Sequence, residues 1–260
     1  MFLEWFFIKD FQTWEIVAVI FSGLCIGVAK TGLNGITTVM VPILALIFGA
    51  KESTGIVLPM LCFADILAVT WYRRKAEFQH ILRLMPWTLG GLILAILIEQ
   101  FIPARGFRFL IGLCIFAGLG VMFWNDSASR KNIEQKTTLS AWWFSALFGL
   151  MGGFSTMIGN AAGPIMAVFL LSMRLPKESF VGTTAWYFMI VNYIKIPLQV
   201  VFWQNITPRG LLFNLTMSPV IIIGAILGIL LVRKVSERVY RIMVYVMTII
   251  STSLLFINFS

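Results

Sequence analysis

Residues Gly149–Phe188 are GLMGGFSTMIGNAAGPIMAVFLLSMRLPKESFVGTTAWYF, and this stretch decides how the rest of the chain is interpreted. It contains two short apolar runs joined by the small and polar residues Ser155–Asn160. An earlier stretch, Gly23–Leu44, is GLCIGVAKTGLNGITTVMVPIL and has the same order, with Lys30–Asn34 as its joint. Several of these runs are shorter than the about 20 apolar residues that a membrane-spanning helix needs. The sequence therefore predicts two matched pairs of short helices.

A shift of 126 residues places the first half of the chain on the second. Glycine, asparagine and charged residues rarely coincide at one offset by chance in an apolar chain, so we predict an internal duplication. Residues 1–124 are the predicted first membrane repeat, 125–138 a cytoplasmic linker and 139–260 the second membrane repeat. The coinciding positions are Gly23 with Gly149, Gly27 with Gly153, Asn34 with Asn160, Met40 with Met166, Leu44 with Leu170, and Lys51-Glu52-Ser53 with Lys177-Glu178-Ser179.

The composition excludes an ordinary soluble protein. Of the 260 residues, 59% are hydrophobic and only 12% are charged, whereas about a quarter of a soluble chain is charged. The apolar residues come in long runs, which predict an all-α polytopic membrane protein of 8–10 segments. The ten predicted segments are Trp14–Ala29, Gly35–Gly49, Thr54–Tyr72, Ile81–Ile98, Phe107–Trp124, Leu139–Phe154, Ala161–Met173, Phe180–Trp203, Leu211–Val232 and Val239–Phe259.

The basic residues predict the orientation in the membrane. If every segment reverses the side of the chain, one side receives 13 of the 20 lysines and arginines and the other receives 5, with Lys30 and Lys195 inside the membrane. The richer side is cytoplasmic by the positive-inside rule, which puts both termini outside. Each half then has five segments, an odd number, so the two repeats are inverted. The 13 residues are Arg73, Arg74, Lys75, Arg83, Arg130, Lys131, Lys136, Arg174, Lys177, Arg233, Lys234, Arg238 and Arg241, and the 5 are Lys9, Lys51, Arg105, Arg108 and Arg209.

The short helix pairs that open each repeat have two interpretations. Each pair can be two tilted, short spanning helices, or a re-entrant hairpin with its polar joint near the midplane. In the second interpretation Asn34, followed by Gly35, and Asn160 begin helices as N-caps, and their exposed backbone N–H groups form an anion site. The simpler alternative is that the asparagines only cap and the glycines only allow close packing. The predicted substrate-binding residues are Lys30, Asn34, Gly35, Ser155, Thr156, Gly159, Asn160, Asn192 and Lys195.

Charged and amide residues deep in the apolar segments support this site. Lys195 lies within an apolar segment, where a charge costs at least about 2.5–3.5 kcal/mol and therefore needs a cavity or a partner. Asn192 is three residues earlier and shares the same helix face. Lys30 is either a fixed positive charge or a side chain that reaches the interface. Asp65 is the mid-membrane carboxylate, which can relay protons, pair with a lysine or only face a small wet pocket, and we predict that it couples transport to a proton.

The two quoted stretches resemble the glycine-rich, proline-containing motifs of the sulfite exporter TauE/SafE family of membrane permeases, in which one motif opens each half. Segment number, length and duplication also match, so the resemblance covers nearly the whole chain. The first stretch departs from the family's run of consecutive glycines at Lys30–Gly35, and the second has Gly159–Gly163 there. The resemblance implies export of sulfite, organosulfonates or related sulfur oxyanions across a prokaryotic plasma (inner) membrane.

The residues and the resemblance together predict a secondary transporter that exports small anions by alternating access. Two alternatives stay open, an anion channel and a carrier of carboxylate anions. An enzyme is not expected, because the chain has one histidine and neither a G-x-S-x-G nor an H-E-x-x-H motif. No cofactor or metal is expected. The expected partners are a small anionic substrate and the lipid bilayer, without nucleic acid, and a homodimer is left open.

Overall fold

The computed structural model describes residues 12–33, 36–98 and 142–256. Every regular element in these ranges is helical, which confirms the all-α prediction. The predicted segment Phe107–Trp124 and the linker 125–138 lie outside the described residues. The elements are α1 (Thr13–Thr31), α2 (Ile36–Phe48), α3 (Ala50–Tyr72), α4 (Phe78–Ile98), α6 (Trp142–Gly159), α7 (Gly163–Ser172), α8 (Lys177–Leu198), the π-helix η2 (Gln199–Trp203), α9 (Pro208–Lys234) and α10 (Glu237–Phe256).

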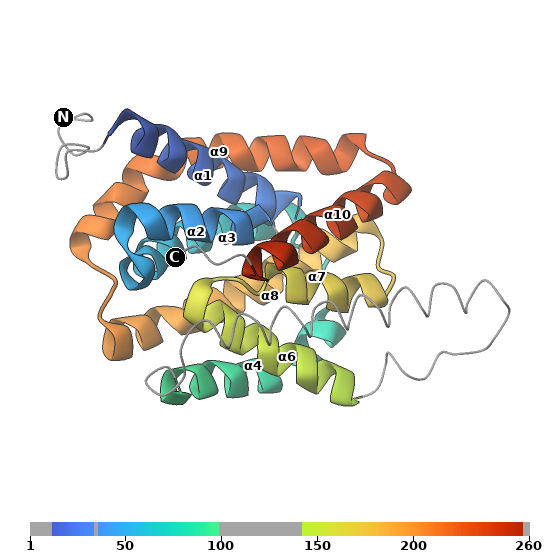
Figure 1. Cartoon of the computed structure of the whole chain (residues 1–260). Coiled ribbons are helices and arrows are strands. Elements are labelled where there is room, and N and C mark those ends of the chain that lie inside the picture. Colours follow the sequence, from blue (N-terminus) through green and yellow to red (C-terminus); the bar gives the residue numbers. More distant parts are fainter. Residues whose placement is uncertain (1–11, 34–35, 99–141, 257–260) are drawn as a thin grey trace, which may run out of the picture.

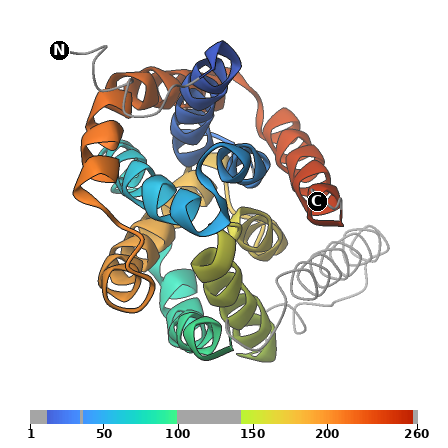
Figure 2. The same ribbon diagram turned by 60° about the vertical axis from the view of Figure 1, so that its left-hand side comes forward.

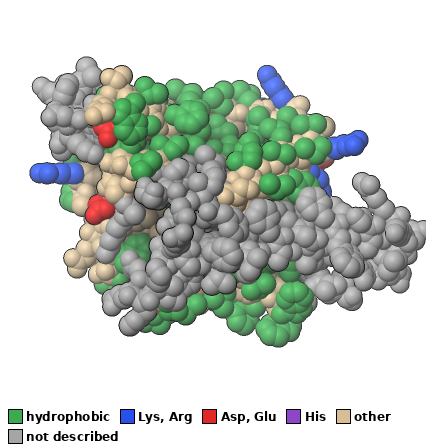
Figure 3. Space-filling model, viewed as in Figure 1, with side chains coloured by type: hydrophobic (Ala, Val, Ile, Leu, Met, Phe, Trp, Pro, Cys, Tyr) green, Lys and Arg blue, Asp and Glu red, His purple; other side chains and the backbone are tan. Residues whose placement is uncertain are grey.

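The described helices have the length and surface of a multi-pass membrane protein. Five stretches are long and apolar enough to cross a bilayer. Large apolar side chains such as Leu82, Leu97 and Leu215 are more than half exposed, which a soluble protein avoids over a wide area. Hydrophobic side chains cover the middle of the described surface, and Lys and Arg side chains lie at its ends (Figure 3). The five stretches are Thr13–Thr31, Glu52–Tyr72, Phe78–Ile98, Lys177–Trp203 and Pro208–Lys234.

Two glycine-lined helix pairs hold the bundle together. Helix α1 lies along α9, and α4 lies along α6 (Figures 1 and 2). A Cβ added at Gly27 of α1 would overlap the carbonyl oxygen of Ile221 in α9, and one added at Gly153 of α6 would overlap that of Thr88 in α4. Gly27 and Gly153 are the positions that the shift of 126 residues superposes. The equivalent helices of the two halves therefore make equivalent close contacts with the opposite half.

Loops that the sequence predicts on the cytoplasmic side lie together at one end of the molecule. The Lys75 ammonium pairs with the Glu178 carboxylate at 2.9 Å, which joins the α3–α4 loop to the start of α8. The Lys177 ammonium donates to the carbonyl oxygen of Val235 at 2.6 Å, which adds the α9–α10 loop. The grouping of these basic loops agrees with the predicted topology, and the side of the membrane on which they lie stays a prediction.

The short helices α2 and α7 each end partway along the molecule. Helix α2 has 13 residues and α3 has 23, so at 1.5 Å per residue they are about 20 Å and about 35 Å long. They meet at Gly49, and the far end of α2 therefore lies well short of the far end of α3. Helices α7 and α8, with 10 and 22 residues, have the same relation in the second half. We call residues 30–33 and 36–37 the first tip, and residues 156–163 the second tip.

The second joint is shorter than the sequence predicts. Helix α6 continues through Ser155 to Gly159, so the predicted joint at Ser155–Asn160 is wrong except at its last residue. Ser155 and Thr156 can remain helical because their backbone groups are bonded within the helix and their side chains lie among buried neighbours. The break occurs at Asn160, whose φ of 52° is left-handed. Asparagine tolerates this conformation and commonly ends a helix in this way.

Candidate functional site

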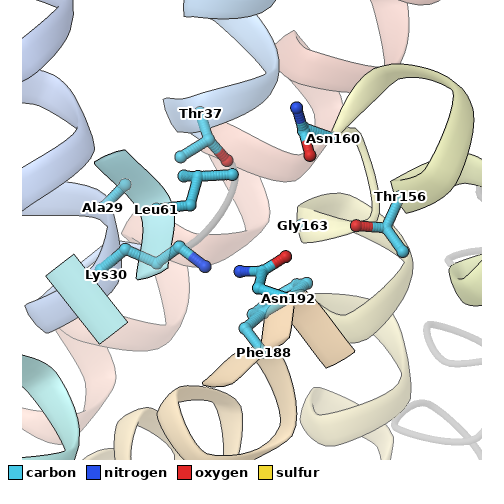
Figure 4. Close-up of a pocket in the computed structure, with 9 residues that line it drawn as sticks. All are labelled: Ala29, Lys30, Thr37, Leu61, Thr156, Asn160, Gly163, Phe188 and Asn192. Carbon is cyan, nitrogen blue, oxygen red and sulfur yellow. The ribbon is translucent and has the colours of Figure 1, made fainter. Parts of the chain in front are cut away.

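The two tips line one cavity between the halves of the chain. Its empty volume is about 310 Å³, including space that is open to the outside. Figure 4 shows the side chains of the first tip facing those of the second tip, with α8 across from both. Helices from both predicted repeats are needed to build its wall. The lining residues are Ala29, Lys30, Thr37, Leu61, Thr156, Asn160, Gly163, Phe188 and Asn192.

A buried ion pair forms one side of the cavity. The Lys30 ammonium, at the end of α1, lies 2.8 Å from Asp65 Oδ1 in α3. The amide nitrogen of Asn192, in α8, donates to Asp65 Oδ2 at 2.6 Å. The Lys30 ammonium also lies 4.2 Å from the centre of the Phe188 ring, a cation–π contact. Lys30 is 5% exposed, so it is a fixed internal charge and does not reach the interface.

A second lysine, Lys195, is bound only by neutral groups. Its ammonium donates to Asn160 Oδ1 at 2.5 Å and to Thr156 Oγ1 at 3.1 Å. The side chain has no exposed surface, and among the described residues no carboxylate contacts it. The Asn160 amide nitrogen in turn faces the carbonyl oxygen of Thr54 at 3.5 Å. Helix α8 therefore supplies both Asn192 and Lys195 to the cavity region, as their spacing of three residues predicts.

The buried ionisable groups are two lysines and one carboxylate. With Lys30 and Lys195 protonated and Asp65 ionised, the described residues of this region would carry one excess positive charge. Asp65 attracts both lysines, while Lys30 repels Lys195. An uncompensated charge in a medium of low dielectric is costly. The arrangement therefore favours a bound anion, which supplies the missing negative charge.

The capping role predicted for Asn160 is wrong. The N-cap of α7 is Ala162, and no side chain caps that helix. Asn160 instead follows the last residue of α6, and its side-chain oxygen accepts from Lys195. The left-handed backbone at Asn160 delays the start of α7 by two residues, so its side chain is free to point across the cavity. The predicted partner of Asn160 in the first half, Asn34, lies outside the described residues, as does Gly35.

The predicted site residues that the structure describes divide into three groups. Lys30, Thr156, Asn160 and Asn192 line the cavity, while Asp65 and Lys195 bind these lining residues from behind. Ser155 is buried near the second tip, and its hydroxyl has no hydrogen-bond partner among the described residues. Gly159 lies in the second tip but does not line the cavity.

Sequence analysis missed Phe188 and the small residues of the wall. Phe188, Asn192 and Lys195 are spaced by four and three residues, so they share one face of α8. That spacing was a usable signal, although an aromatic residue in an apolar segment is ordinarily interpreted as packing. Thr37, which lines the cavity from α2, had no comparable signal.

The chemistry of the site is that of binding. Ammonium, amide and hydroxyl groups converge on the cavity, and such donors recognise oxyanions. Among residues 12–33, 36–98 and 142–256, no group of three or more His, Cys, Asp or Glu side chains is placed to hold a metal ion. The polar lining groups of Lys30, Thr37, Thr156 and Asn192 come from α1, α2, α6 and α8, so a bound ligand would connect four helices.

Comparison with known proteins agrees with this geometry. The sequence model of the family described as Sulfite exporter TauE/SafE matches residues 19–255, which is nearly the whole chain. The match includes both tips and every residue of the cavity. No curated protein and no solved structure gives a significant match.

Proposed function

We propose, from the premise that this chain belongs to the sulfite exporter TauE/SafE family, that it exports sulfite, organosulfonates or related sulfur oxyanions by alternating access. The membrane is a prokaryotic plasma (inner) membrane, with the basic loops in the cytoplasm. The observation that carries the proposal is that two buried lysines face a single buried carboxylate at the cavity where the two tips meet.

Lys195 is central to the proposed anion binding because its buried ammonium donates hydrogen bonds only to uncharged acceptors among the described residues. Asn160 and Thr156 satisfy its protons but provide no negative charge. An oxyanion in the cavity would reduce the electrostatic cost and accept hydrogen bonds from Lys30 and the Thr156 hydroxyl. Each hydrogen bond to a charged group is worth roughly 1.5–3 kcal/mol, so losing one should weaken binding about ten- to a hundredfold.

Alternating access is supported by the way in which the halves interlock. In Figure 1, α1 and α2 extend from one end of the molecule to the first tip, and α6 and α7 extend from the opposite end to the second tip. The packing of α1 on α9 and of α4 on α6 repeats the same contact with the halves exchanged. We therefore propose two inverted repeats with re-entrant pairs, the plan in which a central site is exposed to each side in turn.

Asp65 is the residue that we propose couples anion binding to the contact between α1 and α3. Its carboxylate holds Lys30, and an anion in the cavity competes for the same ammonium. Binding of the anion is thereby linked to the contact between α1 and α3. Since Asn192 binds the other carboxylate oxygen, a change at Asp65 is also transmitted to α8.

The test is uptake of radiolabelled sulfite by liposomes that contain the purified protein. A carrier gives saturable uptake and counterflow, whereas an anion channel gives neither, and competition by small carboxylates would identify a carboxylate carrier. Lys195→Met keeps the volume of the side chain and should reduce sulfite uptake at least about tenfold. Lys234→Met, at the end of α9, is the matched control because it removes an exposed charge. Equal uptake by the two variants would refute the anion site.

A further inference from the structure

We infer that the cavity selects a monoanion that also carries a hydrogen-bond donor, such as hydrogensulfite or a sulfonate with a hydroxyl group. The inference rests on the proposed function and concerns which ionic form of the substrate binds. Two arguments support it, one from the unpaired amide oxygen of Asn192 and one from the charge balance of the region.

The orientation of the Asn192 amide is fixed by its neighbour. Asp65 Oδ2 lies 2.6 Å from the amide nitrogen of Asn192, and an ionised carboxylate can only accept hydrogen bonds. The amide oxygen must therefore point the other way. Figure 4 shows that it points into the cavity, toward the side where Thr156 and Asn160 lie.

The amide oxygen of Asn192 has no hydrogen-bond partner among the described residues, although the side chain is only 1% exposed. A buried acceptor without a donor is unfavourable, and native proteins rarely leave one unpaired. Since no described residue donates to it, this acceptor would bind a donor on the ligand. A fully deprotonated oxyanion has none and would be repelled by the amide oxygen, whereas a protonated oxyanion places its O–H there.

The charge balance gives the same answer. With Asp65 ionised and both lysines protonated, the region would carry one excess positive charge, which a monoanion neutralises. A dianion would leave one negative charge in a buried site. Hydrogensulfite satisfies both requirements and sulfite satisfies neither.

Methylphosphonate and methanesulfonate test the donor requirement, since they have the same shape. At mildly acidic pH both are monoanions, and only methylphosphonate carries an O–H group. We expect purified protein to bind methylphosphonate about tenfold more tightly by calorimetry, the effect of about one hydrogen bond. Sulfate, a dianion without a donor, should bind more weakly than either.

Asn192→Leu removes the acceptor at similar volume. This variant should bind methylphosphonate and methanesulfonate with about equal affinity. Thr184→Val, on the same helix, is the control because the Thr184 hydroxyl donates within α8 to the carbonyl of Phe180. Preference retained in Asn192→Leu would overturn the inference.

A pH series on the unaltered protein tests the same inference without any variant. Raising the pH converts methylphosphonate to a dianion without a donor, so its binding should weaken at least about tenfold while methanesulfonate binding stays constant. The methanesulfonate arm accounts for any effect of pH on the protein itself, including the ionisable side chains near the cavity, which are Lys30, Cys62, Asp65 and Lys195. Parallel pH profiles for the two ligands would overturn the inference.

The outcomes separate this inference from the proposed function. Equal binding of methanesulfonate, methylphosphonate and sulfate overturns the selectivity and leaves the anion site standing, since a water molecule then satisfies the Asn192 oxygen. Binding of none of the three overturns the anion site and the inference together.

Discussion

The ion pair between Lys30 and Asp65 should be cooperative in stability, and a double-mutant cycle can measure it. The single variants are Lys30→Met and Asp65→Leu, and the double variant carries both changes. Each single change leaves one charge of a buried pair without its partner, while the double change leaves an apolar contact of similar volume. The two side chains are 6% and 0% exposed, so solvent cannot replace the missing partner.

The size of the effect follows from the geometry. At 2.8 Å and an effective dielectric constant of about 20, the attraction is about 6 kcal/mol. Desolvation of both ions offsets most of it, so the double variant should have nearly the stability of the wild type. A single variant should lose about 3–5 kcal/mol, or about 6–20 °C in the unfolding midpoint. Asp65→Leu should be worse than Lys30→Met, because it leaves Lys30 and Lys195 as two buried cations without a counter-charge.

Thermal unfolding of the four proteins in one detergent is the assay, with binding of methanesulfonate measured in parallel. The expected order of midpoints is wild type and double variant highest, then Lys30→Met, then Asp65→Leu. Added anion should raise the midpoint of Asp65→Leu most, since that protein has the largest excess of positive charge. A double variant no more stable than the worse single variant would refute the pairing, as would two single variants that unfold with the wild type.

Four further predictions concern packing, topology, burial and the site. Gly153→Ala should lower the unfolding midpoint because its Cβ overlaps the carbonyl of Thr88, whereas Gly90→Ala, with nothing within 4 Å, should not. Cysteine labelling should place the loop before Arg238 in the cytoplasm, and labelling only from outside would reject the topology. Gln199→Leu should raise the midpoint by removing two buried amide atoms that have no partner among the described residues; a lowered midpoint would reveal a partner. Asn160→Ala should weaken anion binding about ten- to a hundredfold without unfolding the protein, and unchanged affinity would reduce Asn160 to a packing role.

The helices could be predicted because apolar runs are a local property of the sequence. The predicted segment Thr54–Tyr72 falls within α3, and Ala161–Met173 contains α7. The end of α6 could not be placed, because Ser155–Gly159 is compatible with a helix or a turn and the packing of Gly153 against α4 decides between them. Local signals thus locate a segment but leave its last turn to tertiary contacts.

The residues of the site could be predicted, but their partners could not. A charge in an apolar segment must be compensated, which singled out Lys30, Asp65 and Lys195. From the sequence alone, either Lys30 or Lys195 could form the ion pair with Asp65. The structure pairs Asp65 with Lys30 because of where α1 ends relative to α3. The role of Asn160 was misassigned for the same reason, since helix capping is a local rule and its actual contact is with Lys195, 35 residues away.

The helix contacts that are repeated in both halves and the charged site residues that are not repeated have different roles in the proposed mechanism. The shift of 126 residues places Lys30 on Thr156, Asp65 on Val191 and Lys195 on Val69, so no charge of the site has a charged counterpart. The glycine contacts that set the helix geometry are repeated in both halves. Symmetric helix packing can expose one site to each side in turn. The asymmetric charged residues can give the two exposed states different energies. Since Lys30 belongs to the first half, and Thr156 with Lys195 behind it to the second, an anion in the cavity would be held by groups from both halves at once. Movement of one half relative to the other then changes the number of donors on the anion, which is how binding and release would be coupled to the change of access.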